Sequence, residues 1–208
     1  VTAIINFTNF VDGIDGLVGG TMIIVLITSA FTLNSPFSIW SLIGALIGFI
    51  FWNWFPSKVF MGDVGSTFLG AVFGGLLLQS ESWTQAFGLL LIATPVLGDA
   101  FFCVLRRYFN GQKIFEAHRL HLYQRLNLAG LSHASVSTIY ILGSIFLALA
   151  FILGGLSSLI YLASLELLIG IFLDHQEHPH FFFLLCLAKL RYVFCLTQSI
   201  HLLLDLYL

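Results

Sequence analysis

Charged side chains are scarce in this 208-residue chain, which contains only 8 Lys and Arg and 10 Asp and Glu residues. A soluble domain of this size needs far more charge to cover its surface, so the composition excludes that class of protein. Hydrophobic residues make up 59% of the chain, and the mean hydropathy is +1.00. The composition therefore predicts an integral membrane protein.

Cysteine is also rare, and the three cysteines have no metal-ligand spacing, so we interpret Cys103, Cys186 and Cys195 as free packing residues. The chain lacks a low-complexity tract, a convincing repeat and a visible secretory signal peptide. Its start at Val1 rather than at a methionine leads us to expect a fragment of a longer protein.

Apolar runs long enough to cross a bilayer as helices follow one another along the chain. They predict an all-α fold, a polytopic transmembrane helix bundle of about six or seven spans. We expect residues 1–173 to form the membrane-embedded region and residues 174–208 to be a divergent tail with a candidate last span. The expected spans are 17–33, 37–54, 66–80, 84–105, 134–153, 156–173 and, less clearly, 181–208.

The segment 106–131 contains five of the eight basic residues and should face the cytoplasm, because positive residues concentrate on that side. Counting back two spans places 55–65 on the same side, and counting back two more places 6–15 there as well. Three polar clusters that are distant in sequence are thus expected at one membrane face.

The first polar cluster contains Asn6, Asn9, Asp12 and Asp15, which recur every three residues before an apolar helix. On a helix this spacing forms one polar stripe. Carboxylates and amides in such a stripe suit a hard cation such as Mg²⁺, or the hydroxyl groups of a sugar nucleotide. Helix capping by Asn and Asp is the alternative for any one of these residues.

The second cluster is Phe60-Met61-Gly62-Asp63-Val64-Gly65-Ser66. Its two glycines would let the backbone approach a ligand, and Asp63 is a candidate metal ligand. The alternative is that Asp63 caps the helix that begins near Ser66.

The third cluster contains His118 and His121, with Arg119 and Arg125 beside them. On a helix, His118, His121 and Arg125 would share a face that could hold a pyrophosphate. A basic helix at the membrane surface is the alternative. A zinc site is rejected, because no further His or Cys stands at structural-site spacing.

Four further polar residues lie outside the clusters. Asp99 follows Pro95 and Gly98, so it is either a functional carboxylate within the membrane or a residue that forms a local salt bridge near Arg106 or a kink. For Glu166, His133 and His201 the sequence names no partner, and satisfied packing or interface positions are expected.

The three clusters together resemble one known family, the polyprenyl-phosphate N-acetylhexosamine-1-phosphate transferases, also called glycosyltransferase family 4. The resemblance rests on the stretches 6–16 and 60–66 and on the histidines at 118–121, and it covers about residues 1–155. The family includes the enzyme that makes lipid I of peptidoglycan and the initiating transferases of O-antigen and related glycans. The pattern at 116–124 looks most like the O-antigen branch that uses deoxy-amino sugars.

This resemblance implies a phosphotransferase that moves a sugar-1-phosphate from a UDP-sugar to undecaprenyl phosphate, with Mg²⁺, or Mn²⁺ in its place, as cofactor. It implies a multi-pass protein of the bacterial cytoplasmic (inner) membrane with its site facing the cytoplasm, in lipopolysaccharide or cell wall synthesis. The expected partners are the UDP-sugar, undecaprenyl phosphate and the lipid bilayer, with no nucleic acid and with a homodimer left open.

By the same resemblance, Asn9 and Asp63 would coordinate the metal, and Asn6 and Asp12 would shape the metal and phosphate site. Asp15 and Phe60 would hold the uridine, with the ring of Phe60 stacked on the base. We place Asp12, Asp63, His118 and His121 among the catalytic residues, and His118, His121 and Arg119 would contact the diphosphate or the sugar.

Two features depart from the family. The chain contains no adjacent aspartate pair, whereas family members carry an aspartate-rich motif upstream of the first cluster. The tail from Asp174 onward does not match the family either, and a polar linker is expected there. The alternatives for function are a transporter or channel, or an inactive remnant of the transferase.

Overall fold

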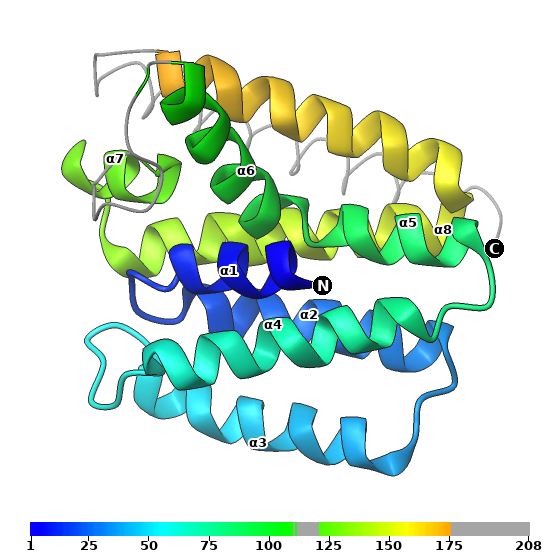
Figure 1. Ribbon diagram of the computed structural model, residues 1–208. Coiled ribbons are helices and arrows are strands. Elements are labelled where there is room, and N and C mark those ends of the chain that lie inside the picture. Colours follow the sequence, from blue (N-terminus) through cyan, green and yellow to red (C-terminus); the bar gives the residue numbers. More distant parts are fainter. Residues whose placement is uncertain (110, 112–120, 176–208) are drawn as a thin grey trace, which may run out of the picture.

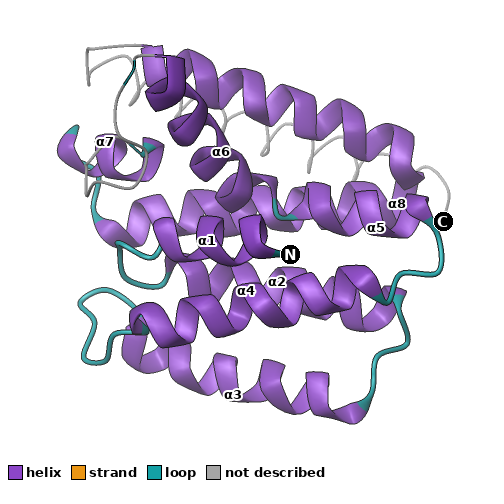
Figure 2. Ribbon diagram, viewed as in Figure 1, coloured by secondary structure: helices purple, strands orange, loops and turns teal. Residues whose placement is uncertain are grey.

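The chain folds into helices in a computed structural model that describes residues 1–109, 111 and 121–175. The described residues contain no strand, in agreement with the predicted all-α fold (Figure 2). The helices are α1 (Thr2–Phe10), α2 (Leu17–Thr32), α3 (Phe37–Asn53), α4 (Gly62–Leu78), α5 (Trp83–Ile92), α6 (Thr94–Phe109), α7 (Leu122–Leu128) and α8 (His133–His175).

Helix α2 forms the centre of the bundle, packed against α3, α4, α5 and α8 (Figure 1). Its sequence is apolar around the whole circumference, as expected for a helix with neighbours on several sides. Leu17, Met22 and Leu26 are completely buried. Helix α1 lies across α4 and α6, so the first polar cluster is held against elements from much later in the sequence.

The expected helix boundaries hold for most of the described chain. Helices α2 and α3 match the predicted spans 17–33 and 37–54, while α4 begins four residues before the predicted position 66. The two predicted spans 134–153 and 156–173 correspond to the two parts of α8, which is broken at Gly155 by a φ of 70° and a ψ of −164°. Glycine adopts this positive φ without steric cost.

The span expected at 84–105 is not one straight helix. The chain forms α5 and α6 there, and their axes differ by 79°. Pro95 lies in the first turn of α6, where its missing N–H is tolerated, but it cannot extend the hydrogen-bonding pattern of α5. An apolar run with an internal proline thus became two helices.

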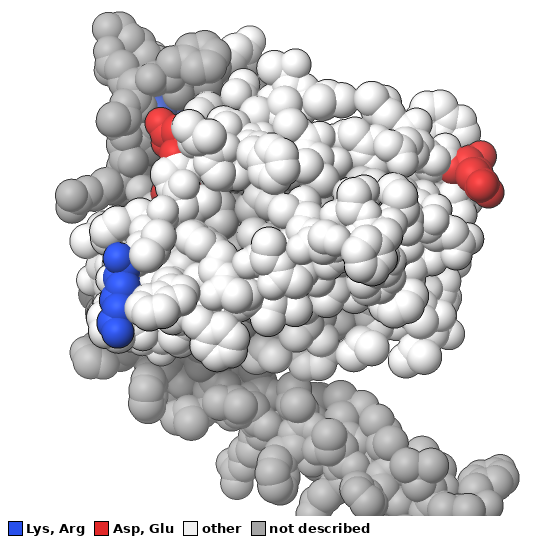
Figure 3. All heavy atoms as spheres, turned by 90° about the horizontal axis from the view of Figure 1, so that it is seen from below, with Lys and Arg blue, Asp and Glu red and all other residues white. Residues whose placement is uncertain are grey.

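One described helix, His133–Leu173, is long and apolar enough to span a membrane. A second candidate span exists if the bent pair α5 and α6 counts as one span. Helices α2, α3 and α4 are apolar but have only 16 or 17 residues. Figure 3 shows a face that is almost free of charge, with the few coloured side chains near its ends. The count of six or seven spans stays a prediction, and its seventh span, 181–208, lies outside the described residues.

The polar segments gather at one end of the bundle. The loop between α1 and α2, the loop between α3 and α4, and helix α7 all lie at the left of Figure 1. Hydrogen bonds join them, including those from Asn9 to Asp63 and from Ser57 to Asp15. The predicted convergence of the three clusters is therefore confirmed for their described parts.

Helix α1 approaches α4 closely because α4 presents glycines to it. A Cβ added at Gly70 would lie 2.8 Å from the Cα of Ile5 and 3.2 Å from the side chain of Thr8. The backbone of α1 cannot move away from this contact without separating Asn9 from Asp63. At Gly75, on the same helix, an added Cβ would meet no atom within 4 Å.

We expect Gly70→Ala to destabilise the protein by about 1–3 kcal/mol, because the added methyl group collides with the backbone of α1. Gly75→Ala is the matched control and should be neutral or stabilising by up to about 1 kcal/mol, since alanine favours helix and meets no neighbour there. Thermal unfolding of both variants in the same detergent measures the difference. Equal stability of the two variants would contradict the close contact between α1 and α4.

Candidate functional site

The first and second polar clusters meet where α1 ends and α4 begins. The Asn9 Nδ2 group donates to Asp63 Oδ1 at 3.2 Å and to Ser66 Oγ at 3.0 Å. Ser66 is buried, whereas Asp63 is exposed at the end of the bundle. The two residues expected to bind a metal, Asn9 and Asp63, are thus in direct contact although 54 positions separate them.

Asp12 belongs to the same group of side chains. It lies in the loop after α1, partly buried, with Ser66 as a hydrogen-bonding neighbour. Burial raises the pKa of Asp12, its hydrogen bond to Ser66 lowers it, and the nearby Asp63 carboxylate raises it, with a result of about 6. A carboxylate pair of this kind repels itself and is stabilised by a cation placed between its members.

A divalent cation fits this donor set only with additional water ligands. In the described part of the chain, no group of three or more His, Cys, Asp or Glu side chains could hold a metal ion. Asp12, Asp63 and the amide oxygen of Asn9 offer two carboxylates and one neutral oxygen. Mg²⁺ is usually held in this manner, by one or two carboxylates, with the remaining positions taken by water and phosphate oxygens. Asn6 is exposed one turn before Asn9.

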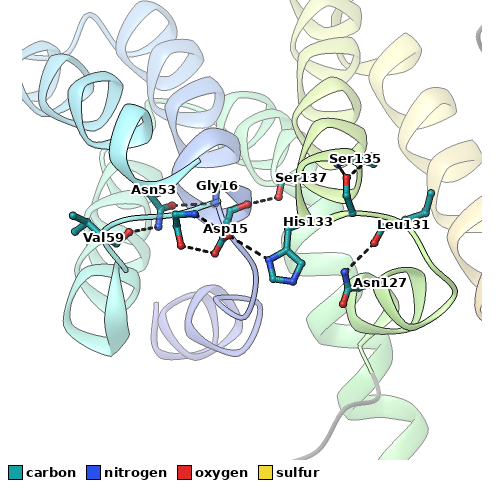
Figure 4. A network of polar contacts seen from close by, with 11 residues as sticks. Asp15, Gly16, Asn53, Val59, Asn127, Leu131, His133, Ser135 and Ser137 are labelled. Atoms are coloured by element: carbon teal, nitrogen blue, oxygen red, sulfur yellow. Dashed lines mark hydrogen bonds and ion pairs between the residues drawn. The ribbon is translucent and has the colours of Figure 1, made fainter. Parts of the chain in front are cut away.

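Asp15 lies in a separate network (Figure 4). Its carboxylate accepts hydrogen bonds from the backbone N–H of Ser57 at 3.2 Å and from the Ser57 hydroxyl at 2.8 Å. His133 Nδ1 lies 3.4 Å from Asp15 Oδ2, which gives His133 a partner that the sequence did not identify. To bind uridine as predicted, the Asp15 carboxylate would have to accept a further hydrogen bond while it keeps these contacts.

The same network fixes the loop 11–16 from two other sides. Asn53, at the end of α3, accepts a hydrogen bond from the backbone N–H of Gly16 at 3.1 Å and donates to the carbonyl of Val59 at 2.9 Å. Ser137 of α8 donates to the backbone carbonyl of Asp15 at 2.6 Å. The loop is therefore held by α3, by the loop after α3, and by α8.

Two surfaces near these networks are open. Phe60 is 76% exposed, two residues before the start of α4, so one face of its ring is available for stacking. A pocket of about 270 Å³ lies between the loop after α1, helix α7 and the start of α8. It is lined by Gly13, Ile14, Gln124, Asn127, Leu128 and His133.

The side chain of His121 is buried, in contact with Asp99. Its Nδ1 lies 3.4 Å from Asp99 Oδ1, and its ring stacks on Tyr123 with centroids 5.5 Å apart. Burial lowers the pKa of His121, but interactions with Asp99 and Cys103 outweigh it and raise the pKa to about 9. His118 and Arg119 lie outside the described residues, so their predicted contacts stay predictions.

Sequence reasoning missed several polar residues of this region. Ser66 stands out in the sequence only as part of the second cluster, although it bonds to Asn9. Asn53 and Ser57 carry no recognisable signal, because their partners are 37 and 42 positions away. Asp99 was singled out in the sequence, either as a functional carboxylate or as a residue of a local salt bridge or kink, but its hydrogen bonds from α7 and from Tyr140 of α8 were not foreseen.

Comparison with known proteins places these residues in a family. The profile of glycosyl transferase family 4 matches residues 1–81, which include both the first and the second polar cluster. A Bacillus subtilis (strain 168) protein, named a probable undecaprenyl-phosphate N-acetylglucosaminyl 1-phosphate transferase, is 34% identical over 165 residues, or 74% of this chain and 46% of the relative.

A second relative is the phospho-N-acetylmuramoyl-pentapeptide-transferase of Streptococcus pyogenes serotype M49 (strain NZ131). It is 35% identical over 139 residues, which cover 61% of this chain and 41% of the relative. The chain thus matches less than half the length of either protein. The family match contains the Asn9, Asp12 and Asp63 group, and the resemblance noted in the sequence is confirmed: this chain belongs to glycosyl transferase family 4.

Proposed function

We propose that this chain takes part in the transfer of a sugar-1-phosphate from a UDP-sugar to undecaprenyl phosphate at the cytoplasmic face of a bacterial inner membrane. The observation that carries the proposal is the contact between Asn9 and Asp63, with Asp12 beside them. The names of the two relatives, which describe sugar-phosphate transferases, support the same reaction class.

The reaction has to bring two anionic phosphates together, so repulsion between them is the main physical obstacle. The residues Asp12, Asp63 and Asn9 would hold a Mg²⁺ or Mn²⁺ ion. When bound, such an ion would offset the phosphate charges and align the attacking and leaving oxygens. Ser66 orients the Asn9 amide from a buried position, and no covalent enzyme intermediate is required.

The nucleotide and the lipid would reach this site from different surroundings. The exposed ring of Phe60 provides a stacking surface for uracil next to Asp63, and Asp15 with the pocket beside Gly13 provides polar contacts. The isoprenoid tail of the acceptor would stay in the bilayer while its phosphate meets the site at the end of the bundle.

The sugar and the product belong to the proposal as well. We propose an N-acetylhexosamine type of sugar, because the relatives are named for N-acetylglucosaminyl and N-acetylmuramoyl substrates. The product would begin a cell-envelope glycan, either an O-antigen of lipopolysaccharide or a cell wall polymer. A panel of UDP-N-acetylhexosamines distinguishes these sugars by direct transfer to undecaprenyl phosphate.

We expect membranes that contain the chain, together with any sequence that precedes Val1 in its reading frame, to transfer labelled sugar-1-phosphate to undecaprenyl phosphate. Asp63→Asn should lower the rate at least about 100-fold, because it removes one charged metal ligand. Glu81→Gln is the matched control, since Glu81 is an exposed carboxylate beyond the opposite end of α4.

Chelation of divalent cations should abolish the transfer, and added Mg²⁺ should restore it. Full activity of Asp63→Asn, or activity that persists in chelator, would contradict the proposed metal site. Absence of transfer with every sugar would contradict the proposed reaction and favour the remnant or transporter alternatives.

We expect Phe60→Leu to raise the KM for the UDP-sugar about 10-fold with a smaller effect on kcat, because stacking of a base on an aromatic ring contributes roughly 1–3 kcal/mol. Phe51→Leu is the matched control: Phe51 is 79% exposed on α3, similar to Phe60, but outside the site. Initial rates over a range of UDP-sugar concentrations give both constants. Equal KM values for the two variants would rule out stacking on Phe60.

A further inference from the structure

The carboxylate of Asp99 is buried in α6 and faces the first turn of α7. Its side chain is 4% exposed. Oδ1 accepts a hydrogen bond from the backbone N–H of Leu122 at 2.9 Å, and Oδ2 accepts one from the backbone N–H of Tyr123 at 3.2 Å. The first N–H groups of a helix have no acceptor within that helix, so one carboxylate satisfies two of them.

Two further side chains lie against this carboxylate. The hydroxyl of Tyr140, on α8, donates to Asp99 Oδ2 at 2.7 Å, and His121 Nδ1 lies 3.4 Å from Oδ1. A buried carboxylate is stable only with such partners, because an unpaired buried charge is strongly unfavourable. Asp99 thereby joins α6, α7 and α8 at one point.

Helix α7 depends on contacts of this kind to keep its place. It contains only seven residues, and an isolated helix of that length is not stable in water. Within the segment itself, the His121 N–H donates to the side chain of Gln124 as part of a capping box. Asp99 supplies the two described hydrogen bonds from the backbone of α7 to α6.

The position of α7 in turn determines the position of the loop that carries Asp12. Tyr123 is 1% exposed, and its hydroxyl lies 3.5 Å from the backbone carbonyl of Phe10. The same hydroxyl fills the space that a Cβ at Gly13 would occupy. Tyr123 thus contacts the residues on both sides of Val11 and Asp12.

From these contacts we infer that Asp99 is a positioning residue: it fixes α7, and through Tyr123 it holds Asp12 in the geometry that the metal and phosphate site requires. The inference rests on the proposed function for its effect on catalysis. Its structural half, the attachment of α7 by Asp99, is independent of that function.

Hydrogen exchange tests the structural half in the unaltered protein. The amides of Leu122 and Tyr123 should exchange at least about 100-fold more slowly than in an unstructured peptide, because Asp99 is their only described acceptor. Exchange at the unstructured rate would overturn the inference, and this measurement needs neither a variant nor enzymatic activity.

Asp99→Asn tests the functional half. An amide has one acceptor oxygen in place of two, so Leu122 or Tyr123 loses its partner, and we expect exchange at one of these amides to accelerate at least about 10-fold. The Mg²⁺ concentration that gives half-maximal transfer should rise about 10-fold, because Asp12 is displaced. This concentration does not depend on the fraction of the protein that is folded. If Asp99 only stabilises the fold, the half-saturating Mg²⁺ concentration stays unchanged in Asp99→Asn, and that result would overturn the inference.

Tyr140→Phe is the matched control, since it removes one hydrogen bond to Asp99 but leaves both backbone bonds of α7. The half-saturating Mg²⁺ concentration should change less than about 3-fold, and Leu122 and Tyr123 should stay protected. A change as large as that in Asp99→Asn would contradict the specific attachment of α7. If the wild-type protein transfers no sugar-phosphate, the proposed function fails, while the exchange data still decide whether Asp99 fixes α7.

Discussion

The direct contact between α1 and α4 is the constraint on which the candidate site depends. Gly70 leaves no room for a side chain between α4 and the backbone of Ile5, so the end of α1 lies against the start of α4. Only this arrangement brings the Asn9 amide to Asp63 and Ser66. The proposed metal site would be assembled from these two helix ends and would need no long loop to close over it.

The loop between α1 and α2 is the second requirement, because it carries both Asp12 and Asp15. It is bound on several sides: by Asn53 at Gly16, by Ser57 and His133 at the Asp15 carboxylate, and by Ser137 at the Asp15 carbonyl. A loop with so many fixed contacts loses little further freedom when a ligand binds. Preorganisation of this kind is what electrostatic stabilisation of a phosphoryl transfer requires.

Much of this arrangement was predictable from the sequence, and the rest depends on packing. The scarcity of charge predicted the apolar bundle, and the even number of expected spans between polar clusters predicted their convergence. The break between α5 and α6 was missed because an apolar run does not show how a proline will be accommodated. The partners of Asp99 and His133 were missed because they are 22 to 118 positions away, at contacts set only by how the helices pack.

The central claim is that Asn9, Asp12 and Asp63 form one divalent metal site that accepts a diphosphate. Electron paramagnetic resonance of Mn²⁺ added to the protein with UDP tests it most directly. We predict one bound Mn²⁺ with hyperfine coupling to the phosphorus of UDP. In a double variant that combines Asn9→Leu with Asp63→Asn, both the bound Mn²⁺ and the phosphorus coupling should be lost. Mn²⁺ bound equally well by the double variant, or bound without phosphorus coupling, would contradict the claim.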